Sequence, residues 1–539
     1  MRRLLWCASL VPLAAFAAFS ACGGNGNGSD GGTDGGGGTD GGGTDGPVTN
    51  PDGGGGDSGV DVGDSVLMRN NHMNRDGLYT QPTFTTAAIA TLKGDTAFDG
   101  TISGNAYAQP LFFDKGPNGK SIVIAATENN QVSALDADTG AVVWQKTIGQ
   151  NAGASGAGCG NIAPLGITGT PAIDPASRTI FLNAAIGTNS AITEHEIHAL
   201  SVDDGSERPN FPVKASTASY QGTNFDPPLE NERGALLFLN GNIYVTYGGH
   251  AGDCGQYHGW VLSIPYPAGG PIGAYAASIA PNTRAAGIWA VGGPASDGTD
   301  VFVTTGNTFG ANTWVGQEAL LRLQPGAAFS NQTADYWAPH NWLTLDNGDV
   351  DIGGSGAMLV DVPGATPSKL AVALGKNGYV YLLDRGNLGG IGASQNTDGL
   401  SNTHVATGSI INAAASVTTS TGTWVVFHGH SGAAGAACPT GSGDLVALKI
   451  SAASPPVATV QWCANSQTQA SPMITTSDGT NDAIVWEVGT HLLGWDVNTG
   501  TQVYTGTDTL ANVRKFNTSI AAKGHIYVAA DNKVYSFKL

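Results

Sequence analysis

Residues 122–125 read Ile-Val-Ile-Ala and residues 132–137 read Val-Ser-Ala-Leu-Asp-Ala, and this pair of short segments decides the fold. β-branched and apolar residues bounded by Gly, Asn and Asp are typical of strands separated by turns. The pair recurs along the chain. Its first members begin at Ile122, Ile180, Ile243, Val301, Leu370, Val425, Ile484 and Ile526, and its second members at Val132, Ile197, Trp260, Ala319, Val380, Leu445, Leu492 and Val534.

The spacing of this repeat predicts a β-propeller. Successive first members stand 42 to 69 residues apart, which suits one four-stranded blade each, with the two segments as strands B and C. A β-sandwich array or a β-helix would not need a regular two-strand unit at this spacing. We therefore expect an all-β fold, an eight-bladed propeller of four-stranded antiparallel blades over residues 66–539, with seven blades as the fallback.

The last repeat requires an outer strand from elsewhere in the chain. Residue 539 follows directly after strand C of the eighth repeat, and a propeller must close its ring. We expect the N-terminal end of the repeat region to supply the missing strand, from residues 65–69.

Composition limits the classes of function. The chain has 539 residues, 41% of them hydrophobic, and a formal net charge of −19. This acidic balance argues against a nucleic-acid partner, because phosphate neutralisation needs a basic surface. The 80 glycines lack the Gly-X-Y period of collagen, so they indicate low complexity or turn-rich β structure.

The N-terminus resembles an export signal followed by a tether. Two arginines precede an apolar run that ends in Ser-Ala-Cys22, so residues 1–21 are similar to a bacterial lipoprotein signal with Cys22 as the acylated residue. An ordinary cleaved signal is the alternative. Residues 22–65, with 20 Gly and eight Asp, predict a disordered linker.

One motif carries a family resemblance. Residues 134–144, ALDADTGAVVW, resemble the repeat signature of the pyrroloquinoline-quinone (PQQ) dehydrogenase-like propellers, and residues 495–504, WDVNTGTQVY, repeat it with Tyr504 in place of Trp144. The resemblance extends over residues 66–539 and includes segments similar to a secreted bacterial subfamily. It implies that Asp136 and the Thr-Gly form a tight turn and that Trp144 docks on the neighbouring blade. A fold of this kind does not itself imply an activity.

Four cysteines remain in the propeller region, and an even number in an exported protein favours disulfides. In a propeller the B–C and D–A connections lie on the same face, and all four cysteines fall in such connections. The near pairs are Cys159 with Cys254 and Cys438 with Cys463. A metal site is the alternative, but no C-x₂-C spacing supports it.

The same face carries the candidate binding residues, because its B–C loops vary most in length and loops on a rigid scaffold usually carry function. The B–C loop of the third blade places His250, Asp253, Tyr257 and His258 beside a cysteine. The other candidates enter inner strands or leave B strands on this face: Gln109, Glu128, Asn129, Glu232, Arg233, Trp289, Asn307, Asp349, Asp351, Lys376 and His428.

Structural roles compete with binding at each of these positions. Glu232 and Arg233 could face the channel mouth or form an ion pair, and the histidines could make structural hydrogen bonds. Residues 346–354 look briefly like a calcium loop, but Val350 stands where an oxygen ligand belongs. We expect no metal site there and expect this segment to lead into strand A of the fifth blade.

Two functions follow as expectations. The first is a cell-envelope lipoprotein, anchored to the outer membrane or cell surface only through its lipid, whose propeller acts as a binding or scaffold module for a protein or saccharide. The alternative, implied by the resemblance, is a periplasmic or surface oxidoreductase that uses PQQ and Ca²⁺ to oxidise an alcohol or sugar. No Cys-Cys pair or C-x-x-C-H haem motif supports the alternative, and no cofactor is assigned from the residues.

Overall fold

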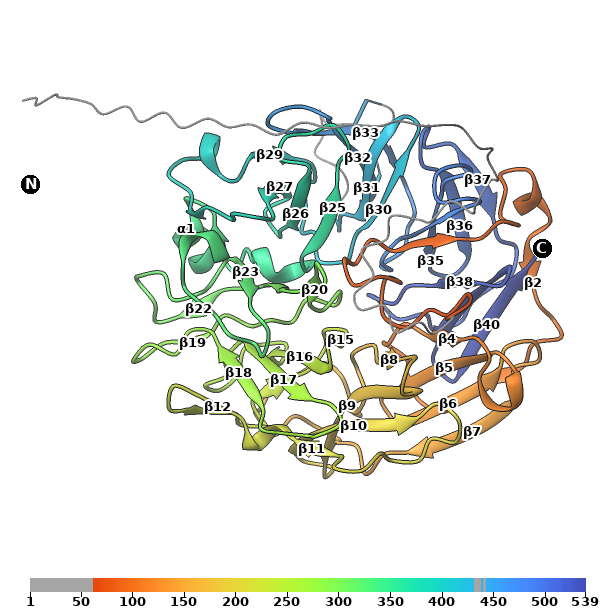
Figure 1. Cartoon of the computed structure of the whole chain (residues 1–539), viewed down its shortest axis with the longest axis horizontal. Coiled ribbons are helices and arrows are strands. Elements are labelled where there is room, and N and C mark those ends of the chain that lie inside the picture. The colour runs from red at the N-terminus through yellow and green to blue at the C-terminus, as the bar shows by residue number, and fades with distance from the viewer. Residues whose placement is uncertain (1–61, 431–437, 440–442) are drawn as a thin grey trace, which may run out of the picture. The chain divides into compact units, whose positions relative to one another are not determined.

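Eight antiparallel sheets follow one another around a ring in the computed structural model (Figure 1). The structure describes residues 62–430, 438–439 and 443–539. The signal-like residues 1–21, Cys22 and the linker up to residue 61 lie outside the described residues. The prediction of an eight-bladed propeller is confirmed.

Each of the first four blades contains four strands in the order A to D. Blade 1 contains β4 (Leu111–Phe113), β5 (Ile122–Thr127), β6 (Gln131–Asp136) and β7 (Val142–Thr147). Blade 2 contains β8 (Ala172–Asp174), β9 (Thr179–Gly187), β10 (Ile192–Ser201) and β11 (Val213–Lys214). Blade 3 contains β15 (Leu237–Leu239), β16 (Asn242–Gly249), β17 (Trp260–Pro265) and β18 (Gly273–Ala276), with β14 (Glu230–Asn231) added beside β16. Blade 4 contains β20 (Ala295–Ser296), β21 (Val301–Thr304), β23 (Leu320–Leu323) and β24 (Tyr336–Ala338), with β28 (Gly390–Ile391) at its edge.

The second four blades complete the ring. Blade 5 contains β25 (Met358–Asp361), β26 (Lys369–Leu374), β27 (Tyr379–Asp384) and β29 (Ser401–His404). Blade 6 contains β30 (Ala415–Thr419), β31 (Gly422–His428), β32 (Leu445–Ile450) and β33 (Ala458–Ala464). Blade 7 contains β34 (Met473–Thr476), β35 (Ile484–Val488), β36 (Leu492–Asp496) and β37 (Gln502–Thr505), and β1 (Leu78–Thr80) pairs with β34 as an additional edge strand. Blade 8 contains β38 (Ile520–Ala522), β39 (His525–Ala530), β40 (Lys533–Lys538), β2 (Lys93–Gly94) and β3 (Gly100–Thr101).

The remaining elements are short and lie in the connections. A small hairpin pairs β12 (Ser219–Tyr220) with β13 (Thr223–Asn224), and a second two-stranded sheet pairs β19 (Arg284–Ala285) with β22 (Thr308–Phe309). The helical turns are α1 (Trp342–Asn347), η1 (Ala88–Thr91), η2 (Pro117–Gly119), η3 (Ala215–Thr217), η4 (Thr333–Asp335), η5 (Ile352–Gly354) and η6 (Gln395–Thr397). Across the described ranges, no helix has the length and apolar character needed to cross a membrane.

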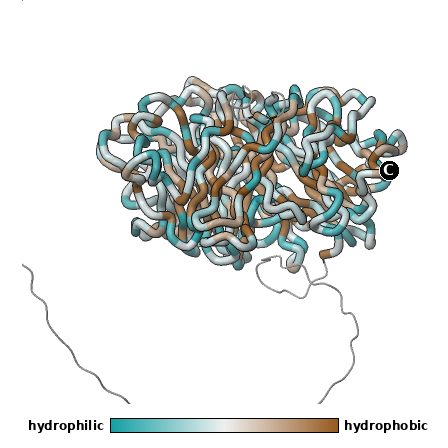
Figure 2. Tube along the Cα trace, turned by 90° about the horizontal axis from the view of Figure 1, so that it is seen from above, coloured by the Kyte–Doolittle hydropathy of each residue, from teal (hydrophilic) through white to brown (hydrophobic). Residues whose placement is uncertain are grey.

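The repeated segments form strands B and C of every blade, as their composition predicts. β5, for example, is buried along its whole length, and β6 along all but its first residue. Figure 2 shows apolar residues along the strands inside the propeller and polar residues in many of the connections. Both faces of a blade are covered by its neighbours, which explains why the strands are nearly continuous apolar runs.

The repeat signature builds a joint between blades. Asp136 Oδ1 accepts hydrogen bonds from the backbone N–H and the hydroxyl of Thr139, which forms the tight turn into β7. Trp144 on β7 donates from Nε1 to the carbonyl of Val202 in blade 2 at 2.8 Å. A Cβ at Gly205, whose φ is +69°, would lie 2.7 Å from the Trp144 ring. The docking role implied for Trp144 is confirmed.

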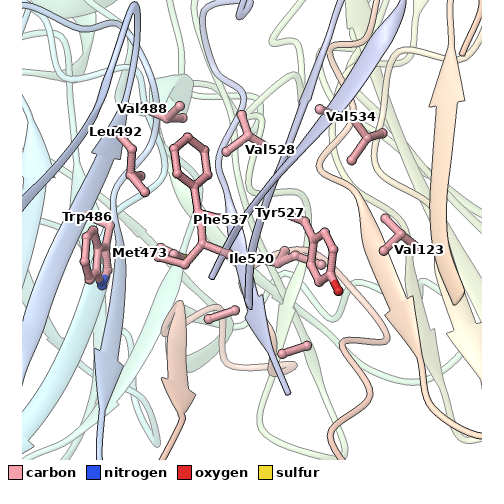
Figure 3. Packing of buried hydrophobic residues seen from close by; sticks show 14 of the residues in the cluster. Val123, Met473, Trp486, Val488, Leu492, Ile520, Tyr527, Val528, Val534 and Phe537 are labelled. Atoms are coloured by element: carbon pink, nitrogen blue, oxygen red, sulfur yellow. The ribbon is translucent and has the colours of Figure 1, made fainter. Parts of the chain in front are cut away.

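The hydrophobic core is divided into clusters that join neighbouring blades. Figure 3 shows part of the largest, in which Trp486 of blade 7, Phe537 and Tyr527 of blade 8 and Val123 of blade 1 belong to one buried cluster. All four side chains are almost inaccessible to solvent. Burial of this kind is the main favourable contribution to folding, so each blade depends on its neighbours.

The ring closes with a different segment from the one that the sequence predicts. β2 and β3 pair with β40, with Lys93 opposite Lys538 and Gly100 opposite Val534. Residues 65–69 do not form this outer strand, because Val66 pairs with Phe112 of the inner strand β4. The N-terminal region closes the ring, as expected, but through residues 93–101.

Residues 66–81, which we call the axial segment, lie against the inner strands of the ring. The carbonyls of Leu67, Met73, Asn74, Asp76 and Gly77 accept backbone hydrogen bonds at 2.7 to 2.9 Å from blades 2, 4, 5, 6 and 7, in that order. Val66 pairs with blade 1, and the side chains of Arg75 and Gln81 reach blades 3 and 8. The axial segment therefore contacts all eight blades.

The two disulfides have the predicted pairing. Cys159 is bonded to Cys254, and Cys438 to Cys463. Cys463 lies in strand β33, near its end, rather than in the connection that follows. Both bonds lie on the face that we call the long-loop face, formed by the B–C connections and by the D–A connections 148–171, 215–236, 277–294, 339–357, 405–414, 465–472 and 506–519.

Candidate functional site

Side chains from several blades meet where the propeller axis reaches the long-loop face. The guanidinium carbon of Arg233, which leads into blade 3, lies 4.7 Å from the centroid of the Trp289 ring and 5.2 Å from that of Phe516. Trp289 leads into blade 4 and Phe516 into blade 8, so Arg233 reaches across the axis. Its Nε also donates to the Trp289 carbonyl at 2.9 Å.

Two lysines complete this group, which we call the axial cluster: Arg233, Trp289, Lys376, Lys515 and Phe516. Lys376 Nζ lies 5.6 Å from the Trp289 ring, and Lys515 Nζ lies 4.9 Å from the Phe516 ring. Cations over aromatic faces are attracted by the ring quadrupole. The cluster thus joins three positive side chains to two aromatic rings in a protein of net charge −19.

The positive charges differ in how they are compensated. Lys376 forms ion pairs with Asp351 and, at 2.9 Å, with Asp349. Burial alone would lower the pKa of Lys376, but these two carboxylates outweigh it and raise the pKa. Burial lowers the pKa of Arg233 to about 10, so this group stays charged at neutral pH. No carboxylate in the described ranges lies within 4 Å of Arg233.

Two other acidic candidates, Glu128 and Glu232, do not belong to the axial cluster. Glu128 accepts hydrogen bonds from the Gly166 N–H at 2.6 Å and from the Thr168 hydroxyl at 2.8 Å. Glu232 accepts from the Gly169 N–H at 3.0 Å, and a Cβ at Gly169 would overlap its Oε1. Both carboxyl groups are buried and link one blade to the next, so a structural role accounts for each.

Burial changes the protonation of these linking carboxyl groups. It raises the pKa of Glu128 to about 7 and raises that of Glu232 well above the usual range. Glu487, which accepts from the Thr468 hydroxyl at 2.8 Å, has its pKa raised to about 8 by burial. Removing a charged carboxylate from water is costly, and the protonated form avoids that cost.

The candidates on the disulfide-linked loop of blade 3 have partners within that loop region. The Tyr257 hydroxyl donates to Asp253 at 2.7 Å, and the His258 N–H donates to Glu230 at 3.0 Å. His250 is buried and lines a pocket of about 100 Å³ beside Cys159. Burial lowers its pKa to about 4, so His250 is neutral at pH 7.

The structure places the other candidates apart from one another. Gln109 holds the axial segment, accepting from the Asn70 N–H at 3.0 Å and donating to the Met68 carbonyl at 3.2 Å. Asn129 is exposed and donates to Ser103. Two more lie within hydrogen-bonding or ion-pair range of buried groups: Asn307, whose N–H donates to Asp351 at 2.8 Å, and His428, whose Nδ1 lies 3.7 Å from Glu487.

Sequence reasoning missed two members of the axial cluster. Lys515 and Phe516 lie in the connection that leads into strand A of blade 8. Arg233 and Trp289 were candidates because they lead into strand A of their blades, and the same rule identifies Lys515 and Phe516. Glu318 and Glu487 were also missed, although each is a carboxylate in or beside an apolar strand.

The described residues do not fit PQQ with Ca²⁺. Across these ranges no group of three or more His, Cys, Asp or Glu side chains is placed to hold a metal ion. In the calcium-like segment, Asp346 accepts from Thr308, whereas Asp349 and Asp351 both pair with Lys376 and Asp351 also accepts from the Asn307 N–H. Arg233 and Lys376 lie over the ring of Trp289, where a planar quinone would have to stack.

Comparisons with known proteins support the fold. No protein-family model matches the chain, and no curated protein matches it. Among solved structures, a quinohemoprotein alcohol dehydrogenase from Pseudomonas putida HK5 is 11% identical, with a TM-score of 0.57 over 88% of this chain and 80% of that one. A europium-containing methanol dehydrogenase is 13% identical, with a TM-score of 0.56 over 88% of this chain and 98% of that one. The quinohemoprotein alcohol dehydrogenase from Comamonas testosteroni is 12% identical, with a TM-score of 0.54 over 89% and 81%. At such identities the likeness shows the propeller fold alone.

Proposed function

We propose that this protein is an exported, lipid-anchored binding module that recognises carboxylate groups of a protein or saccharide ligand at its axial cluster. The observation that carries the proposal is Arg233, a charged guanidinium at the channel mouth with aromatic rings on two sides and no carboxylate within 4 Å in the described ranges. A guanidinium is planar and suits a carboxylate through paired hydrogen bonds.

The surroundings of Arg233 favour an acidic ligand. Lys515 is exposed beside Phe516, so a ligand carboxylate could contact both cations. Arginine and aromatic side chains supply much of the binding energy in interfaces. The acidic remainder of the protein would direct such a ligand towards this positive centre and away from other surfaces.

The cellular location belongs to the same proposal. Two disulfides are typical of proteins that fold outside the cytosol. We infer that acylated Cys22 anchors the chain to the outer membrane or cell surface, and that residues 22–65 act as a tether. A flexible chain of this length has a root-mean-square reach of roughly 35–40 Å, enough to present the propeller away from a membrane.

Calorimetric titration tests the binding function. The purified protein would be titrated with an oligogalacturonate and with a glutamate-rich peptide, and with a neutral oligosaccharide and a lysine-rich peptide as ligand controls. We expect one acidic ligand to bind and Arg233→Met to weaken that binding by about tenfold or more.

A matched variant tests whether weaker binding is specific to the axial cluster or follows from the loss of any arginine charge. Arg178 also lies over an aromatic ring, 5.1 Å from the Phe113 centroid, but it lies in an A–B connection, at the opposite end of the blades. Arg178→Met should bind as the unchanged protein does. Equal binding by both variants, or binding of neutral ligands only, would contradict the proposed site.

The same protein preparation tests the oxidoreductase alternative. Because Trp289 is covered and the acidic side chains do not converge on a metal, we expect no stoichiometric quinone spectrum when PQQ and Ca²⁺ are added. Quinone binding with oxidation of an alcohol or sugar would replace the binding proposal.

A further inference from the structure

Two guanidinium groups are buried at the propeller axis without an acidic partner. Arg69 and Arg75 of the axial segment are 0% and 2% exposed. No carboxylate among the described residues lies within 4 Å of either group. A buried charge that is not paired is costly, so two neighbouring positive charges require an explanation.

The known partners of these arginines are neutral. Arg75 donates to the carbonyls of Pro294 at 2.9 Å, Arg69 at 2.8 Å and Leu236 at 3.0 Å. Arg69 donates from Nη2 to the Ser471 hydroxyl at 3.1 Å and to the Phe516 carbonyl, whereas its Nε and Nη1 have no hydrogen-bond partner in the described ranges. Carbonyl dipoles stabilise the guanidinium groups but do not remove the net positive charge.

A small cavity lies directly beside Arg75. Its volume is about 10 Å³, and its walls include Arg75, Ser355, Gly356 and Met358. Ser355 is 4% exposed, and its hydroxyl has no hydrogen-bond partner among the described residues. A space of this size holds about one water-sized particle.

We propose that a chloride ion occupies this cavity, bound by the Arg75 guanidinium and the Ser355 hydroxyl. Each guanidinium NH₂ group carries two hydrogens, and the single bonds made by Nη1 and Nη2 of Arg75 leave one hydrogen on each. A water molecule could fill the space but would leave the charge of the two arginines unchanged. A monovalent anion bound there would offset the charge and accept a hydrogen bond from Ser355.

The charge state of the arginines supports this site. Burial lowers the pKa of Arg75 to about 9, with a further contribution from the charge of Arg69, and lowers that of Arg69 to about 10. Both groups therefore remain protonated at neutral pH. The anion would stabilise the axial segment within the ring, a role separate from ligand binding at Arg233.

Anomalous diffraction locates the ion directly. Crystals of the protein grown in sodium bromide should show an anomalous peak between Arg75 and Ser355, because bromide replaces chloride and scatters anomalously. A water-sized feature without anomalous signal would overturn the proposal.

Thermal unfolding tests the same site in solution. At constant ionic strength, replacing sodium gluconate by sodium chloride at a hundredfold excess over the dissociation constant should raise Tm by about 3 °C, and Tm should rise with the logarithm of the chloride concentration. Ser355→Ala should weaken chloride binding by about tenfold, since it removes one hydrogen bond to a charged group. A Tm that does not depend on chloride would overturn the proposal.

Ser519→Ala is the matched control. Its hydroxyl is also buried and also has no hydrogen-bond partner among the described residues, but Ser519 is not part of the cavity wall. The chloride-dependent increase in Tm should be unchanged in Ser519→Ala. A similar loss in both serine variants would show that the effect is general and would contradict the site.

Discussion

The joints between blades and the contacts at the axis differ in how far their side-chain contacts repeat. At the joints the same arrangement occurs more than once. Trp144 of blade 1 donates to the Val202 carbonyl of blade 2, and Trp462 of blade 6 donates to the Val497 carbonyl of blade 7 at 2.7 Å. At the axis, five blades donate a strand A backbone N–H to a carbonyl of residues 66–81, but the side-chain contacts of this segment, such as those of Arg75 and Gln81, each occur once. Repeated contacts provide stability, whereas single-copy contacts can provide a specific site.

The joint can be broken most strongly at Trp144. Trp144→Ala removes a buried ring and leaves the Val202 carbonyl without its donor, so the free energy of unfolding should fall by about 3–4 kcal/mol. Guanidinium chloride denaturation measures this change. Val143→Ala, at the exposed neighbouring position, should change it by less than about 0.5 kcal/mol. A loss below 1 kcal/mol for Trp144→Ala would show that the joint is not a major source of stability.

The axis can be broken at Gln109, with a smaller effect. Gln109→Ala leaves the Asn70 N–H and the Met68 carbonyl without partners, which should cost about 2 kcal/mol of unfolding free energy. We also expect faster proteolysis within residues 66–81, measured by mass spectrometry of the fragments. Gln145→Ala, on the exposed side of β7, is the control and should leave the cleavage unchanged. Unchanged proteolysis in Gln109→Ala would show that the Gln109 hydrogen bonds do not hold the axial segment in place.

A third test of the comparison uses the pH dependence of stability. Burial raises the pKa of Glu487 from 4.5 to about 8. Between pH 4.5 and pH 8 this carboxyl group is therefore protonated in the folded protein and ionised in the unfolded chain. The stabilising contribution of this carboxyl is complete below pH 4.5 and is lost as the pH rises through 8. Glu487→Gln should remove about 3 kcal/mol of that decline between pH 5 and 8.

Denaturation at several pH values measures the Glu487 effect. Gln at this position keeps an oxygen that can accept from Thr468, so the packing need not change. Asp138→Asn, at an exposed turn position, should retain the pH dependence of the unchanged protein. If Glu487→Gln also retains it, the carboxyl is ionised when folded.

The sequence predicts the repeated part of the molecule well and the single-copy part poorly. Apolar periodicity identifies strands B and C of all eight blades, and loop topology identifies both disulfide pairs. The axial segment has no such signal, because Val66–Arg69 has a strand-like composition that suits an inner or an outer strand equally. The place of this segment in the fold depends on contacts with residues hundreds of positions away in the chain, such as Phe516.

The candidate site shows the same limit. The rule that residues just before strand A are candidates correctly identifies Arg233 and Trp289. It does not distinguish a residue at the channel mouth from a buried carboxyl group that links two blades. Glu232 and Arg233 are adjacent in the chain, yet one links two blades and the other crosses the axis. Sequence spacing cannot supply that difference, since it arises from packing between separate blades.

The axial segment also constrains the order in which the parts of the fold assemble. Residues 66–81 precede every blade in the chain and contact all of them, so each blade can meet the same segment as it is synthesised. The ring itself cannot close until β40 pairs with β2, which are separated by about 440 residues. A peptide held by eight blades cannot easily be inserted into a finished ring. The segment must therefore be in place before closure, as a core around which the blades assemble.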